Sequence, residues 1–191
     1  MSYIAAFDPG SRNFGYAIVD MKKLTVVENS MNRRTVNTLV HKIDKEQKQK
    51  YVDFLLELKA RGCEALIAER FQTRGNGGPL IEQISFMLGV ASMIFPRYRL
   101  VIASQWKTAY KRNGFDIESF YEELKPIETH QIDASLIGLW IACRTKGVPL
   151  LTRNKLKLTI KRSSIIAEKI RRIKKHKKAN KKTVNTGSTK C

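Results

Sequence analysis

The stretch IAAFDPGSRNFGYAIVD, residues 4–20, decides the fold. Two apolar runs, 3–8 and 14–20, predict strands that are joined by a Pro-Gly turn and a glycine-containing loop. A third run, LTVVEN at 24–29, follows after a short link and completes a predicted antiparallel meander. The first strand ends on Asp8, and a carboxylate beside a buried strand is costly unless a partner compensates it. Asp8 is therefore a candidate functional residue, with a turn-forming role before Pro-Gly as the alternative.

Strands and helices alternate in the rest of the chain. The predicted helices are at 36–60 (with a break in its polar middle), 79–95, 116–125 and 128–146, the strands at 63–71 and 99–104, and a short basic element at 105–114. Three antiparallel strands followed by alternating strands and helices predict an α/β fold, with one mixed sheet flanked by helices.

The net charge of +19 is concentrated near the C-terminus. Residues 153–191 contain fifteen Lys and Arg and one acid, whereas bases exceed acids by only five over residues 1–152. The sequence predicts a body at 1–152 and a basic arm at 153–191, partly helical and then disordered. The stretch SSIIAEKIRRIKKHKK, residues 163–178, is the candidate for a basic amphipathic helix, and the last ten or so residues are expected to be disordered. Such an arm predicts a polyanionic partner, most often nucleic acid, with a solubilising or localisation tail as the alternative.

Composition also excludes some classes of protein. No apolar stretch approaches the roughly 20 residues that span a bilayer, and the N-terminus reaches an acid too early for a signal peptide. The three cysteines are widely separated, which indicates reduced thiols. We expect an intracellular protein without a membrane partner, in the cytoplasm or nucleoid or at a viral replication site.

Four residues are candidates for one catalytic cluster. Asp8 and Glu69 end two predicted apolar strands, and chemistry in α/β sheets collects outside the carboxyl ends of the strands. His130 and Asp133 are three residues apart, so the start of the last core helix places them on one face. The non-catalytic alternatives are an ion pair of Glu69 with Arg70 or Arg74 and a surface position on the helix for Asp133.

A divalent cation would relieve the repulsion among three such acids. Carboxylate oxygens suit Mg²⁺ or Mn²⁺, and two such ions can hold the attacking and leaving oxygens of a phosphodiester. His130 is a candidate metal ligand or general base, because imidazole titrates near neutral pH.

Three stretches, AFDPGSRNFGYAIVD, LIAERF and HQIDASLIGLW, occur in an order that resembles the RuvC-type Holliday-junction resolvases of the RNase H-like nuclease superfamily. The resemblance covers roughly residues 1–146 at the level of motifs. It implies a five-stranded mixed sheet in the order 3-2-1-4-5, a nuclease domain at 1–152 and a homodimer, in a chain of viral or phage type. It also implies that Asp8, Glu69, His130 and Asp133 form the catalytic, metal-binding set, with two Mg²⁺ ions that Mn²⁺ can replace.

The resemblance further indicates where DNA would bind. The predicted DNA contacts are Arg12, Phe71, Arg74, Lys107, Lys111 and Arg112. Phe71 would open the junction, with an ordinary core position as the alternative, and Trp106 is expected to pack. The helix at 79–95 is a candidate dimer interface, with ordinary core as the alternative.

The predicted function is a magnesium-dependent endodeoxyribonuclease of the crossover-junction type, acting in DNA recombination and repair. It would resolve four-way junctions by paired nicks. The alternatives are an RNA–DNA hybrid or flap and branch nuclease of the same fold, and a non-catalytic architectural DNA-binding protein. An actin-like ATPase is disfavoured because that fold normally needs two duplicated domains.

Overall fold

The computed structural model describes residues 2–9, 14–32, 45–70 and 79–185. Five strands and six helices occur within these residues, and none of the helices is long and apolar enough to cross a membrane. The order is β1 (Tyr3–Pro9), β2 (Phe14–Asp20), β3 (Thr25–Asn32), α2 (Lys45–Ala60), β4 (Cys63–Glu69), α3 (Pro79–Ile94), β5 (Arg97–Val101), α4 (Ala103–Arg112), α5 (Ile117–Leu124), α6 (Thr129–Lys146) and α7 (Arg153–Asn185).

The five strands form one mixed sheet in the order β3-β2-β1-β4-β5, as predicted. The first three strands pair antiparallel, which confirms the meander, and β4 and β5 add to β1 in parallel. The central strands β1 and β4 therefore end at the same edge of the sheet.

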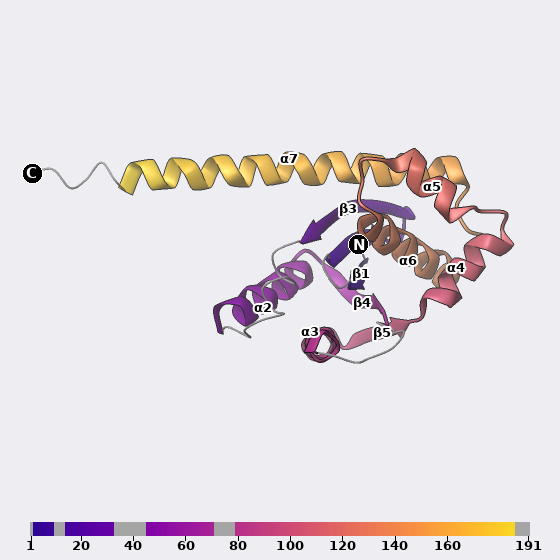
Figure 1. Cartoon of the computed structure of the whole chain (residues 1–191), viewed down its shortest axis with the longest axis horizontal. Coiled ribbons are helices and arrows are strands. Elements are labelled where there is room, and N and C mark those ends of the chain that lie inside the picture. Colours follow the sequence, from indigo (N-terminus) through magenta and orange to yellow (C-terminus); the bar gives the residue numbers. More distant parts are fainter. Residues whose placement is uncertain (1, 10–13, 33–44, 71–78, 186–191) are drawn as a thin grey trace, which may run out of the picture.

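Helices cover both faces of the sheet (Figure 1), and the side chains of the strands alternate between two separate cores. In β1, Ile4 and Ala6 belong to the core beneath α4, α5, α6 and α7, whereas Ala5 and Phe7 belong to the core beneath α2 and α3. Such a strand, buried on both sides, is expected at the centre of an α/β sheet.

Helix α6 is the central helix of the first core. It lies close against β1 and β2 because a glycine on the sheet and a glycine on the helix each leave no side chain between them. A Cβ on Gly15 of β2 would lie 2.0 Å from the backbone carbonyl oxygen of His130, at the start of α6. A Cβ on Gly138, within α6, would lie 2.7 Å from Cγ2 of Val19. The helix is therefore seated directly on the sheet, which fixes the position of its first turn.

The structure corrects the predicted strand at 99–104. β5 begins two residues earlier, at Arg97, and ends at Val101, while α4 begins at Ala103. The change occurs at Ile102, whose extended backbone caps α4 and whose N–H donates to Oε1 of Gln105. The short basic element predicted at 105–114 is therefore the main part of a ten-residue helix.

The last helix, α7, begins ten residues before the basic stretch in which a helix was expected. Leu156, Thr159, Ile160 and Ser163 are buried at helical spacing against β3 and α6. The division of the chain at residue 152 stays a prediction, but the first turns of the predicted arm contribute side chains to the core.

Candidate active site

Asp8 and Glu69 lie side by side at the carboxyl ends of the two central strands. Phe7 of β1 pairs with Ala68 of β4, so the two acids are the next residues on adjacent parallel strands. Each acid continues the alternating series that faces α6, Ile4 and Ala6 in β1 and Ile67 in β4. The carboxylates are therefore directed to the α6 side of the sheet, and only 7% of Asp8 is exposed.

The first turns of α6 bring His130 and Asp133 to the same place. Gly15 pairs with Asp8 across β1 and β2, and the backbone of His130 packs directly over this glycine. Nδ1 of His130 lies 2.7 Å from Oδ2 of Asp8, a hydrogen bond between residues 122 positions apart. The amino end of a helix carries partial positive charge, which further stabilises an anion at Asp8.

A second layer of side chains holds the other two acids. The indole N–H of Trp106, in α4, donates to Oε2 of Glu69 at 2.8 Å. The hydroxyl of Tyr121, in α5, donates to Oδ1 of Asp133 at 2.5 Å. Lys107 contributes a positive charge, with Nζ 3.8 Å from Oδ2 of Asp133. Each acid thus has a partner from a helix on the same face of the sheet.

The pKa values in this cluster show that the charges act on one another. Burial, and then the charge of Asp8, raise the pKa of Asp133 to about 7. Burial and the charge of Asp8 also raise the pKa of Glu69. The hydrogen bond to Asp8 raises the pKa of His130, against the opposing effect of burial. The site therefore concentrates negative charge that its neighbours offset only in part.

The donor set of this cluster suits a hard divalent cation. Carboxylate oxygens are the ligands that Mg²⁺ and Mn²⁺ prefer, and the charge of Asp8 helps to raise the pKa values of both Glu69 and Asp133. Among the described residues, no three His, Cys, Asp or Glu side chains are close enough together to form a ready-made metal cluster. The residues thus fit a cation in their chemistry, and the metal-binding roles of all four stay predictions.

The predicted DNA contacts are only partly within the described chain. Lys107 lies beside Asp133, and Lys111 and Arg112 are exposed in the last turn of α4. The remaining three, Arg12, Phe71 and Arg74, lie outside the described residues.

Sequence reasoning missed the hydrogen-bonding roles of Trp106 and Tyr121. Trp106 is fully buried, as its predicted packing implies, and a buried indole usually needs an acceptor for its N–H. That requirement could have predicted that the indole N–H of Trp106 has a hydrogen-bond acceptor. Tyr121 has no comparable signal, because only the folded chain shows that α5 approaches Asp133.

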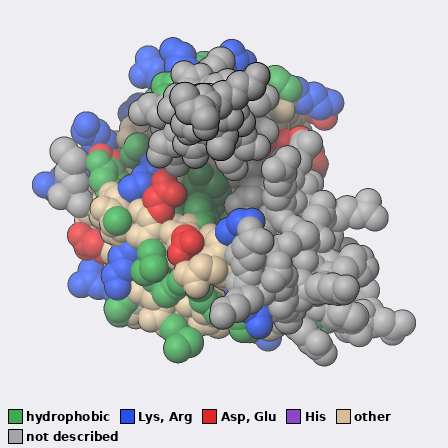
Figure 2. Space-filling model, turned by 90° about the vertical axis from the view of Figure 1, so that its left-hand side faces the viewer, with side chains coloured by type: hydrophobic (Ala, Val, Ile, Leu, Met, Phe, Trp, Pro, Cys, Tyr) green, Lys and Arg blue, Asp and Glu red, His purple; other side chains and the backbone are tan. Residues whose placement is uncertain are grey.

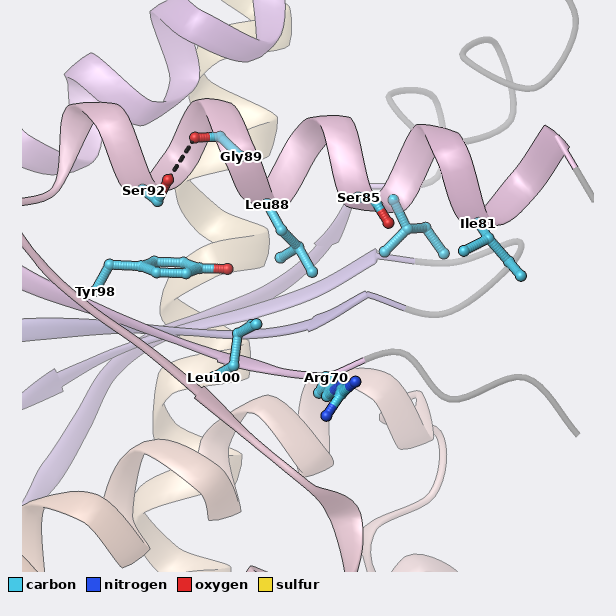
Figure 3. A pocket seen from close by; sticks show the side chains of 9 residues that line it. Arg70, Ile81, Ser85, Leu88, Gly89, Ser92, Tyr98 and Leu100 are labelled. Atoms are coloured by element: carbon cyan, nitrogen blue, oxygen red, sulfur yellow. Dashed lines mark hydrogen bonds between the residues drawn. The ribbon is translucent and has the colours of Figure 1, made fainter. Parts of the chain in front are cut away.

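A cavity of about 400 Å³ lies away from the acids, between α3 and the edge strand β5 (Figure 3). Leu88 and Ile81 of α3 line it from one side, and Tyr98 and Leu100 of β5 from the other. Arg70 also lines it, directly after Glu69 in the chain. The buried hydroxyl of Tyr98 has no hydrogen-bond partner among the described residues.

Comparison with known proteins finds likeness in structure alone. No protein-family model and no curated protein matches the sequence. RuvC of Thermus thermophilus in complex with a Holliday junction substrate has a TM-score of 0.57 at 20% identity, over 78% of this chain and 99% of that one. A second structure of Thermus thermophilus RuvC has a TM-score of 0.55 at 16% identity, over 78% and 98% of the two chains.

A weaker likeness is to the Fowlpox virus resolvase in complex with Holliday junction DNA, with a TM-score of 0.42 at 13% identity, over 75% of this chain and 98% of that one. At these identities a structural likeness establishes the fold and not the activity. The chain therefore has the RuvC-like, RNase H-like fold that its motifs predict.

Proposed function

We propose that this chain is a metal-dependent, structure-selective DNA endonuclease that resolves four-way junctions by paired nicks. One observation carries the proposal: Asp8 and Glu69 lie at the ends of adjacent parallel strands, and α6 brings His130, which is 122 residues beyond Asp8, and Asp133 against them. Carboxylates that are buried together at the carboxyl edge of a sheet, despite their mutual repulsion, are typical of a catalytic site.

In the proposed reaction, His130 accepts a proton from the attacking water. Asp8 accepts a hydrogen bond from Nδ1, which fixes the neutral ring as the tautomer that carries its proton there. Nε2 is then the basic atom, and no hydrogen bond from the described chain engages it. The hydrogen bond to Asp8 raises the pKa of His130, which makes its neutral imidazole a stronger base.

The three acids would hold the metal. Asp8, Glu69 and Asp133 supply the oxygen ligands, and Trp106 and Tyr121 orient two of them through hydrogen bonds. Bound Mg²⁺ would supply charge stabilisation for the phosphodiester and for its departing oxygen. Lys107 balances part of the negative charge and is the proposed contact to a DNA phosphate beside the acids.

The substrate proposal follows from symmetry and charge. A four-way junction is two-fold symmetric, so a homodimer would place one site at each of two opposed strands. The α3 side of the molecule offers a surface for a second copy, because Phe86 and Met93 of α3 and Leu100 of β5 are exposed there. Affinity for DNA would come mainly from Lys and Arg contacts to phosphates.

The test is incubation of the purified chain with synthetic four-way, three-way, flap, linear and RNA–DNA hybrid substrates, with Mg²⁺, Mn²⁺ or EDTA. We expect paired, symmetric nicks on the four-way substrate that EDTA abolishes. Cutting of the hybrid or flap alone would replace junction resolution with one of those activities. Tight binding without any cutting would indicate an architectural protein and contradict the proposal.

A further inference from the structure

The first part of α7 is fixed to the body of the protein. The backbone N–H of Val26, in β3, donates to Oγ1 of Thr159 at 2.8 Å, and Nδ2 of Asn29 donates to the carbonyl of Ile160 at 3.4 Å. Glu123 of α5 pairs with Arg153 at 2.6 Å and with Lys157 at 2.9 Å. Buried contacts and ion pairs thus set the direction in which the helix runs.

The second part of α7 leaves the body. After Ser163, none of the side chains that the structure describes on this helix is buried. Figure 1 shows the helix continuing well beyond the sheet and its covering helices. At 1.5 Å per residue, the 22 residues that follow Ser163, up to Asn185, extend about 33 Å.

This projecting part is the most basic segment of the chain. Between Lys169 and Lys182, nine of the fourteen residues are Lys or Arg and none is an acid. Like charges four positions apart, such as Lys174 and Lys178, destabilise a helix. A polyanion bound along the segment would remove this repulsion and so stabilise its helical state. Figure 2, which looks at the end toward which α7 runs, shows Lys and Arg side chains along the upper and left-hand edges of this face, with a few Asp and Glu side chains among them.

Duplex DNA matches the segment in charge density. The nine bases are spread over about 20 Å of helix, and duplex DNA carries roughly one negative charge per 1.7 Å of its axis. A membrane surface is a poorer match, because an interfacial helix needs a continuous apolar face and this stretch has few apolar residues.

We propose that the projecting half of α7 is a second DNA contact that binds the phosphate backbone of one duplex arm, at a fixed position relative to the acids. The inference rests on the proposed function for its substrate. It adds that the basic segment is mounted rigidly, because the same continuous helix is anchored in the core. The region of the duplex arm that the segment protects from hydroxyl radicals should therefore be short and at a fixed position along the duplex.

The first test neutralises charge. Binding of the full chain to a four-way junction and to linear duplex is measured in EDTA over a range of salt concentrations, with hydroxyl-radical footprinting on the same complexes. The α7 variant is K174Q/K175Q/K177Q/K178Q. The control neutralises four exposed cations near the β2–β3 turn and the end of α6, as K22Q/K23Q/R144Q/K146Q.

For the α7 variant we expect a slope of log affinity against log salt that is shallower by about 3 to 4, and the loss of one protected patch on an arm. Affinity at 0.1 M salt should fall at least about tenfold. The control should change the slope by less than 1 and leave the patch in place. An unchanged slope in the α7 variant, or an equal change in the control, would overturn the inference.

The second test breaks the rigid mounting and keeps the charge. Four residues, Gly-Gly-Ser-Gly, are inserted after Glu168, beyond the last buried side chain. We expect the salt slope to stay within 1 of the wild-type value while the discrete patch spreads along the arm. A patch as sharp as that of the wild type would show that the mounting does not position the contact.

These tests are separable from the proposed nuclease activity, because they are performed without a divalent cation. Failure to nick DNA in Mg²⁺ would contradict the proposed function and leave the binding results intact. Nicking by a chain whose footprint lacks the α7 patch would overturn this inference alone. Tighter binding of the segment to anionic phospholipid vesicles or to RNA than to duplex DNA would also overturn it.

Discussion

Substitution of Gly15 by alanine should displace the start of α6 and with it two of the four proposed catalytic residues. The added Cβ would lie 2.0 Å from the carbonyl oxygen and 2.3 Å from the carbonyl carbon of His130. Both atoms belong to the backbone, so no rotation of a side chain can relieve the contact. The first turn of α6 must move away from β2, or β2 must move away from the helix.

The size of the movement can be worked from the contact. Ordinary van der Waals contact for a Cβ begins near 3.4 Å, so the carbonyl of His130 must retreat by about 1.4 Å. A misplacement of about 1 Å in a catalytic group can cost on the order of 100-fold in rate. Overpacking of this kind typically costs about 1–3 kcal/mol of unfolding free energy.

The assay combines denaturant unfolding with single-turnover nicking of a four-way junction at saturating protein. Gly15→Ala should lower both the unfolding free energy and the nicking rate, and leave the affinity for DNA in EDTA within about threefold. The matched control is Gly138→Ala on the same helix, where the added Cβ would meet Cγ2 of Val19 and not the backbone. This control should lose stability and keep its nicking rate.

Wild-type stability together with a wild-type nicking rate in Gly15→Ala would refute the reasoning, because α6 could not then be seated on β2 as described. Loss of stability with a normal rate would show that the position of His130 does not limit the chemistry.

Three further substitutions test the acids and their partners. Asp8→Asn should abolish nicking and leave junction binding in EDTA within about threefold, since a neutral amide replaces the charged acceptor of His130 and the proposed metal loses a carboxylate ligand. Residual cutting above about 1% by gel assay would contradict the role of Asp8. Trp106→Phe removes the N–H donor to Glu69 and should raise the Mg²⁺ concentration for half-maximal nicking about tenfold or more, with a parallel loss in Mn²⁺ binding followed by electron paramagnetic resonance. Asp133→Asn should abolish nicking. It should also raise the unfolding free energy of the metal-free protein at pH 8 by a few kcal/mol, because it removes a buried charge. An unfolding free energy at pH 8 that is equal to or lower than that of the wild type would contradict this account of burial.

Local sequence patterns predicted most of the sheet. The strands β1 and β2 were predictable because apolar runs are bounded by turn residues, and the convergence of Asp8 with Glu69 because both acids end central strands. The order of the five strands came from the resemblance to the resolvases and is confirmed. These features depend on residues close together in the chain or on a known fold.

Features that depend on long-range contact could not be predicted in the same way. The early start of α7 was missed because Thr159 and Ser163 are polar, and only contact with β3 makes their side of the helix a buried face. The pairing of Tyr121 with Asp133 depends on how α5 is placed against α6. The end of β5 was placed too late because Ile102 fits a strand and is instead the extended residue that caps α4.

The acids and the histidine together impose a dependence of stability on pH that has one sign. The pKa of Asp133 is raised from 3.8 to about 7, and those of Glu69 and His130 are raised as well. A group whose pKa is higher in the folded state stabilises the protein below its unfolded pKa, and this contribution is lost as the pH rises through the folded pKa. Asp133 therefore favours the metal-free fold in mild acid and loses this contribution as the pH rises through about 7, and the contributions of Glu69 and His130 change in the same direction. The proposed divalent cation would offset this loss of stability, because it would stabilise the ionised acids, so the stability of the protein at alkaline pH should rise with the concentration of Mg²⁺.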